Sequence, residues 1–131
     1  MSSSKRPAVI NKPEFADDPR VLAGAVVAAL EEVKGVAITT IDVRGKTPLT
    51  DFLVIASGNS ERHLLTLRDA VLECAAGLGI RPLGVEGAGA AEWILIDLVD
   101  CVVHLMRPAA RAFYDLERLW SVGPEAAPPS S

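Results

Sequence analysis

The stretch that decides the fold is EWILIDLVDCVVHLM, residues 92–106. Two strongly apolar runs flank a short turn in it, and this pattern predicts a buried β-hairpin. A tryptophan, a histidine, a methionine and several carboxylates are embedded in the same stretch. That mixture is unusual for a core and typical of a surface that binds a partner.

The hairpin assigns each of its residues to one face, because side chains alternate along a strand. With Leu98 and Val99 as a two-residue turn, Trp93 pairs with His104 and Leu95 with Val102, while Asp97 pairs with Asp100. One face is then purely apolar, which assigns it to the helix-covered core: Ile94, Ile96, Cys101, Val103 and Leu105. The other is amphipathic and is the candidate binding face: Trp93, Leu95, Asp97, Asp100, Val102, His104 and Met106.

Val99 is the difficulty in this register, because two-residue hairpin turns need positive φ and favour Gly or Asn. A three-residue loop is the alternative, and it would place Trp93, Leu95 and Asp97 on the face of Cys101, Val103 and Leu105. We favour the two-residue turn because its faces segregate better.

Working outward, the patterns predict an α/β (α+β) fold with the order α-β-β-α-β-β-β-α. The expected elements are a helix over 19–34, strands over 36–43 and 51–56, a helix after Ser60, a strand over 81–86, the hairpin, and a last helix opened by Pro108. Strand 51–56 is apolar on both faces and should be interior. We expect a five-stranded mixed sheet with helices mainly on one face. The open face would then be a partner site.

Length and composition indicate one domain over residues 19–121, between a flexible arm, 1–18, and a disordered tail, 122–131. The 13 basic and 17 acidic residues give a net charge of −4, which argues against strong direct nucleic-acid binding and suits a basic partner. Cys74 and Cys101 are interpreted as buried hydrophobes, not as a disulfide or metal ligands. Neither a secretory signal nor a membrane span is evident, so a cytoplasmic protein is expected.

Enzymatic interpretations of individual residues are weaker than structural ones. His63 follows a helix N-cap and is expected to have a capping or surface role. His104 with Asp97 and Asp100 offers a single histidine beside a turn, which is a poor metal site. Gly58-Asn59-Ser60 resembles the Gly-Ser motif of nucleotidyltransferases, but no suitably spaced carboxylates follow it. Phe113, Leu116 and Trp120 share a helix face and are expected to pack in the core, with a dimer contact as the alternative.

The chain resembles the ribosomal silencing factor family, also called the Iojap-related family, over about residues 20–121. The resemblance rests on the order of several stretches: Gly45-Lys46, Thr50 to Gly58, Ser60 with Arg62-His63, Pro82 to Gly87, Trp93 to Asp97, Asp100 with Val103-His104, and Arg111 to Trp120. It departs from the family at Leu98-Val99, where Tyr-Gly is frequent.

The resemblance implies a nucleotidyltransferase-like fold without catalysis or cofactor. It implies binding to the large ribosomal subunit through ribosomal protein L-fourteen, which blocks joining of the small subunit and represses translation, and a homodimer when free. Carried over by position, the partner interface is Glu86, Trp93, Asp97, Leu98, His104 and Met106. The alternatives are a degenerate nucleotidyltransferase-like enzyme using Asp97 and Asp100, and an acidic dimeric scaffold with no role at the ribosome.

Overall fold

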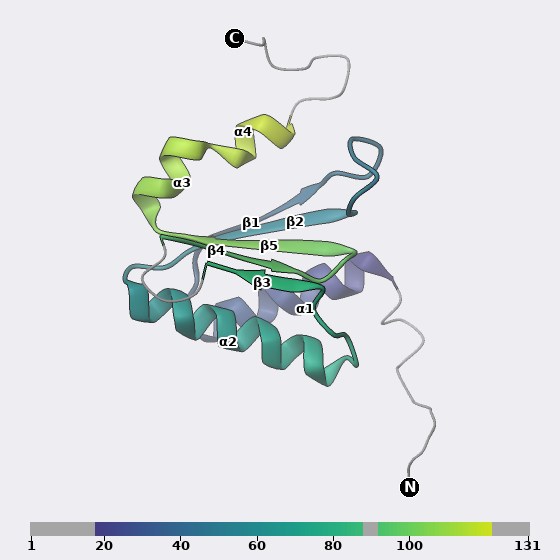
Figure 1. Cartoon of the computed structure of the whole chain (residues 1–131), viewed down its shortest axis with the longest axis horizontal. Helices are drawn as coiled ribbons and strands as arrows, with labels where there is room; N and C mark the ends of the chain where they lie inside the picture. The colour runs from purple at the N-terminus through teal and green to yellow at the C-terminus, as the bar shows by residue number, and fades with distance from the viewer. Residues whose placement is uncertain (1–17, 88–91, 122–131) are drawn as a thin grey trace, which may run out of the picture.

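Five strands form one mixed sheet in the order β1-β2-β5-β4-β3, as the computed structural model of residues 18–87 and 92–121 shows (Figure 1). The strands are β1 (Val36–Asp42), β2 (Phe52–Ser57), β3 (Gly84–Glu86), β4 (Trp93–Asp97) and β5 (Cys101–Met106). β2 and β5 are parallel and the other neighbours are antiparallel. All six residues of β2 are buried, as expected of an interior strand.

Two long helices, α1 (Pro19–Glu32) and α2 (Glu61–Gly77), cover one face of the sheet (Figure 1). α1 begins where the Asp18 side chain accepts a hydrogen bond from the Arg20 backbone N–H, so Asp18 belongs to the folded part and not to the predicted arm. The Ser60 side chain caps α2 in the same way. The core between helices and sheet includes Leu30, Leu64, Ile94, Ile96 and Val103, each fully buried. The predicted fold class is confirmed, and so is the predicted element order as far as the last helix. The rest of the predicted arm and the predicted tail lie outside the described residues.

The hairpin has the predicted faces but a different turn. Leu95 pairs with His104 and Trp93 with Met106, so the predicted pairs Trp93–His104 and Leu95–Val102 are wrong. The turn is centred on Val99 and Asp100, with a hydrogen bond from the Leu98 N–H to the Cys101 carbonyl. The pairing thus moves by two residues, and a shift by two leaves every side chain on its face. Val99 does have a positive φ of 75°.

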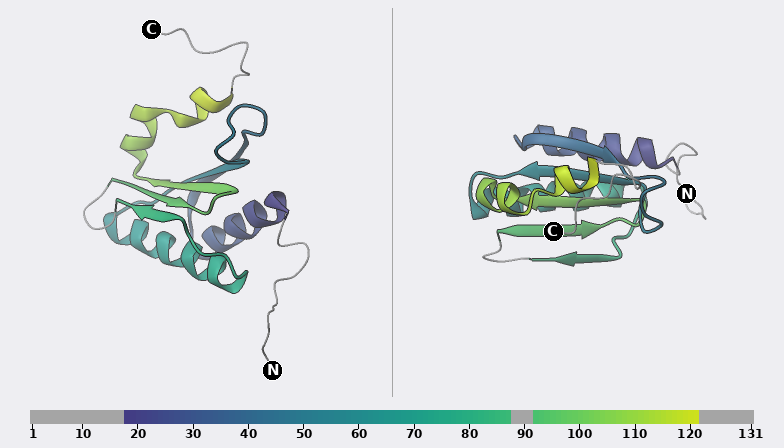
Figure 2. Two further views of the ribbon diagram at one scale, coloured as in Figure 1. Left: turned by 45° about the vertical axis from the view of Figure 1, so that its right-hand side comes forward. Right: turned by 90° about the horizontal axis from the view of Figure 1, so that it is seen from above.

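The last helix is broken, which corrects the predicted stripe of Phe113, Leu116 and Trp120. It forms α3 (Pro108–Tyr114) and α4 (Leu116–Ser121), separated by Asp115 in the left-handed region with φ 51°. The break takes the three residues off a common face, and Phe113 is 79% exposed instead of packed in the core. Both short helices lie on the side of the sheet opposite α1 and α2 (Figure 2).

Candidate binding surface

The face of the sheet that α1 and α2 leave free is itself divided in two. Strand pairing aligns its side chains in rows, one of which runs Thr39, Ile55, His104, Leu95 and Glu86 from β1 to β3. At the β1–β2 end, Ile55 is fully buried although it lies outside the core under the long helices. At the β4–β3 end, Leu95 is half-buried and Glu86 is exposed. Along this row the side chains thus become accessible from β5 toward β4 and β3, while Thr39 at the opposite edge is half-buried.

Arg111 of α3 holds the covered half together. Its guanidinium donates to both carboxylate oxygens of Glu117 at 2.9 and 3.0 Å, to the Ser57 hydroxyl at 3.0 Å and to the Thr39 hydroxyl at 3.1 Å. The Arg111 side chain is 11% exposed. This contact lowers the pKa of Glu117 below its usual value, chiefly through the hydrogen bonds from Arg111. One largely buried cation thus joins α3, α4, β1 and β2.

The accessible half forms a surface that we call the open strip: Glu86, Trp93, Leu95, Asp97 and Val102. All five alternate onto the same face, and each is half-buried or exposed. Trp93, Leu95 and Asp97 follow one another on this face of β4, with Glu86 opposite Leu95 on β3 and Val102 opposite Asp97 on β5. Such a surface suits a partner with basic groups around an apolar patch.

Trp93 is held from two sides within the open strip. Its indole Nε1–H donates to His104 Nδ1 at 3.0 Å. Its ring lies 4.7 Å, between centroids, from the ring of Tyr114 at the end of α3. Tyr114 in turn meets exposed Phe113 edge-to-face at 5.0 Å. An aromatic cluster therefore extends from the strip onto α3.

Three of the predicted interface residues are not at the surface. His104 is 8% exposed and Met106 is fully buried, because both lie in the part of the face toward the covered strands. Leu98 is 2% exposed and packs in the core beneath the sheet, since it pairs with buried Cys101 across the turn. Glu86, Trp93 and Asp97 remain as residues that a partner can reach directly.

Leu95 and Val102 were placed on this face by strand alternation but were not named as interface residues. Tyr114 was missed altogether. The sequence pattern could not indicate its contact with Trp93, because that contact depends on where α3 lies and on the break at Asp115.

Both aspartates of the hairpin accept hydrogen bonds at the turn, Asp97 through its carboxylate and Asp100 through its backbone carbonyl. Asp97 Oδ1 accepts a hydrogen bond from the Val99 N–H at 2.8 Å. The Asp100 carbonyl accepts from the N–H groups of Asp51 and Phe52, which ties the turn to the start of β2. In the described ranges 18–87 and 92–121, no cluster of three or more His, Cys, Asp or Glu residues is arranged to hold a metal ion.

His63 joins two elements on the other side of the molecule. Its Nδ1 accepts from the Asn59 N–H at 3.0 Å, so Nε2 carries the proton and donates to the Val33 carbonyl at 2.9 Å. The ring therefore connects the start of α2 to the end of α1. The predicted capping role of His63 is confirmed, and the ring also contacts the end of α1.

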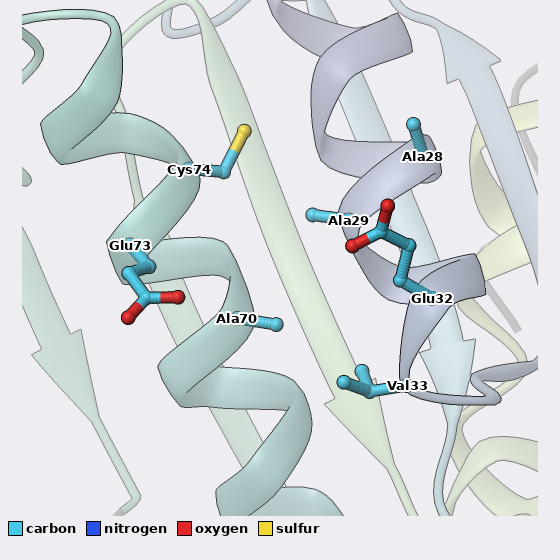
Figure 3. A pocket seen from close by; sticks show the side chains of 7 residues that line it. All are labelled: Ala28, Ala29, Glu32, Val33, Ala70, Glu73 and Cys74. Atoms are coloured by element: carbon cyan, nitrogen blue, oxygen red, sulfur yellow. The ribbon is translucent and has the colours of Figure 1, made fainter.

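A shallow groove of about 380 Å³ lies between α1 and α2 (Figure 3). It is lined by Ala28, Ala29, Glu32, Val33, Ala70, Glu73 and Cys74. Burial raises the pKa of the Cys74 thiol, which disfavours the reactive thiolate. Cys101 is fully buried, and burial raises its pKa to about 12. Both cysteines are free; Cys101 is buried as predicted, whereas Cys74 is only half-buried and lines the groove.

No helix in the part of the chain that the structure describes is long and apolar enough to cross a membrane.

Comparisons with known proteins agree on one family. The family model described as "Ribosomal silencing factor during starvation" matches residues 16–130. A ribosomal silencing factor from Zymomonas mobilis is 35% identical over 128 residues, which cover 95% of this chain and 94% of that protein. The mouse protein "Mitochondrial assembly of ribosomal large subunit protein 1" is 33% identical, over 74% of this chain and 44% of its own length. A crystal structure from Chromobacterium violaceum superposes with a TM-score of 0.77 at 32% identity, covering 87% of this chain and 91% of that one.

Proposed function

Because this chain belongs to the family of ribosomal silencing factors, we propose that it binds the large ribosomal subunit through ribosomal protein L-fourteen and blocks joining of the small subunit. Family membership implies ribosome-associated regulation of translation. The name of the mouse relative supports the choice of the large subunit. In this proposal the chain represses translation as a steric factor and not as an enzyme, and it acts in the cytoplasm.

The observation that carries the proposal is the open strip. Trp93 is a large aromatic side chain, half-buried and held from two sides, at the end of the open strip that borders α3. Residues of this kind dominate the binding energy of protein interfaces. Glu86, opposite Leu95, and Asp97, at the other end of β4, lie on the same strip and form no ion pair with any residue in 18–87 or 92–121. They are therefore available to basic side chains of a ribosomal protein, and would orient the partner.

Sedimentation with separated ribosomal subunits tests the proposal. We expect the wild-type chain to travel with the large subunit alone, and Trp93→Ala to lose at least roughly thirtyfold in affinity, as expected for a large aromatic interface residue. Leu49→Ala is the matched control, because Leu49 is an apolar side chain 83% exposed in the β1–β2 loop, away from the strip. Circular dichroism establishes that each variant is folded. Addition of the wild-type chain should also slow subunit joining followed by light scattering.

Charge variants test the orientation of the partner. Glu86→Lys should weaken binding to purified L-fourteen protein, whereas Glu73→Lys, with the same change in net charge but on α2, should not. Asp97→Asn removes a charge and keeps an acceptor for the Val99 N–H, so it separates charge from turn geometry. Equal effects of the lysine variants at 86 and 73 would indicate attraction by net charge alone. A wild-type chain that sediments with neither subunit would favour the acidic scaffold.

We also propose that the free chain is a homodimer. Exposed apolar side chains on α3 and α4, Phe113 and Leu119, support a further contact surface there. Analytical ultracentrifugation of the wild type beside Phe113→Ser tests it: a monomer for both would reject the dimer.

A further inference from the structure

We propose that His104 is a positioning residue for Trp93 and not a partner contact: its Nδ1 accepts the indole N–H and so fixes how the indole is presented to the ribosomal protein. This inference rests on the proposed function and assigns His104 a different role from the one that the family resemblance implies. His104 is 8% exposed, and at that burial its side chain offers a partner almost no area.

The imidazole of His104 accepts a hydrogen bond from the indole of Trp93. Trp93 and His104 are not directly paired across the strands, since Trp93 lies opposite Met106 and His104 opposite Leu95. The two rings nevertheless approach to 5.7 Å between centroids, and the indole Nε1 lies 3.0 Å from Nδ1. The bond therefore runs diagonally and draws the indole along the face toward His104. An accepting Nδ1 requires the proton on Nε2, so the neutral ring in one tautomer makes this bond.

This contact determines what the partner meets. The single polar atom of the indole is already hydrogen-bonded inside the chain, so Trp93 presents carbon surface and not a free donor. Tyr114 borders the same ring at 4.7 Å and lies on α3, which Arg111 joins to Ser57 of β2. Between them, His104 and Tyr114 restrict the rotamers of Trp93 before binding. A side chain ordered in advance loses less conformational entropy at the interface.

Two variants at position 104 separate positioning from packing. His104→Asn keeps an acceptor near the place of Nδ1 but loses ring volume. His104→Leu keeps volume in a buried site but has no acceptor. A packing role predicts that Leu is tolerated better than Asn. A positioning role predicts the reverse order for binding: a loss of roughly tenfold in affinity for L-fourteen protein with Leu, the worth of about one neutral hydrogen bond, and partial rescue with Asn.

The indole N–H resonance of Trp93 reports positioning without the ribosome. It is recorded in a Trp120→Phe background, which leaves Trp93 as the chain's single tryptophan. In the wild type and in His104→Asn, we expect this resonance to be protected from exchange with water. In His104→Leu, we expect it to be shifted and unprotected. Unchanged protection and affinity in His104→Leu overturn the positioning role. Failure of the wild type to bind any large subunit overturns the proposed function instead, so the two failures are distinguishable.

Discussion

The two faces of the sheet are completed in different ways. Under α1 and α2, apolar side chains from helices and strands close a continuous core in which nearly every contributing residue is fully buried. On the other face, α3 and α4 cover the strands at the β1–β2 end, and a hydrogen-bonded guanidinium holds them there. The first face is built for stability, because burial of apolar surface is the main force that favours folding. The second face buries less apolar surface, and a strip of the sheet stays accessible there.

The largest expected difference in stability is between alanine variants of two neighbouring residues of β4, whose side chains point to opposite faces of the sheet. Ile96→Ala should cost about 3 kcal/mol of unfolding free energy, because Ile96 is fully buried in the core. Leu95→Ala should cost roughly 1 kcal/mol, because Leu95 is half-buried on the open strip. Urea unfolding measures both. Binding to L-fourteen protein should be weakened more by Leu95→Ala than by Ile96→Ala. Equal losses of stability in the two variants would contradict the proposed difference between the faces.

Acid should affect the second face through His104. Burial lowers the pKa of His104 to about 4, against 6.5 in the unfolded chain, so the unfolded state takes up the proton first as the pH falls. Above pH 6.5 both states are neutral at His104, and the free energy of unfolding keeps its full value. Between about pH 6.5 and about pH 4, protonation of His104 in the unfolded chain lowers that free energy by up to roughly 3 kcal/mol.

The measurement is urea unfolding of the wild type and His104→Leu at several pH values. Carboxylates such as Glu117 also titrate toward the acid end, and the difference between the two proteins cancels their part. That difference should fall as the pH falls. A difference independent of pH would mean that His104 is not held neutral by burial.

The covering helices should depend on Arg111 more than on any surface ion pair. Arg111→Met should cost roughly 2 kcal/mol, because it leaves the hydroxyls of Ser57 and Thr39 and the Glu117 carboxylate without their shared donor. Arg68→Met removes a pair with Asp69 at the surface and should cost about 0.5 kcal/mol or less. Hydrogen exchange should rise in α3 and α4 of the first variant and leave α1 and α2 protected. Uniform loss of protection would show that both faces unfold together.

The smallest effect should be a gain of stability from a substitution in the turn that joins β4 and β5. Val99 is β-branched, has φ 75°, and is bridged by a hydrogen bond from the Asp100 N–H to the Leu98 carbonyl. Val99→Gly should therefore raise the unfolding free energy by roughly 0.5 kcal/mol, since relief of the left-handed strain outweighs the added freedom of the unfolded chain. Thermal unfolding measures it, with Val102→Gly as the strand control that should destabilise. A loss with Val99→Gly would mean that the turn holds no strain.

Much of the second face could be predicted before the structure, and the missing part has a clear cause. Strand alternation placed Trp93, Asp97, His104 and Met106 on one face, and the structure agrees even though the pairing moved by two residues. Alternation cannot say whether a face is covered. Burial of His104 and Met106, and the contact of Tyr114 with Trp93, depend on helices that lie elsewhere in the chain.

The sequence by itself determined the element order, the interior position of β2, the apolar core face of the hairpin and the resemblance to one family. Each of these follows from local periodicity or from a short motif, which tertiary context did not override. The tertiary structure alone decided the turn at Val99 and Asp100, the break at Asp115, and the side of the sheet on which α3 and α4 lie. These features depend on contacts between distant segments, above all those of Arg111 with Thr39 and Ser57, and no local pattern records them.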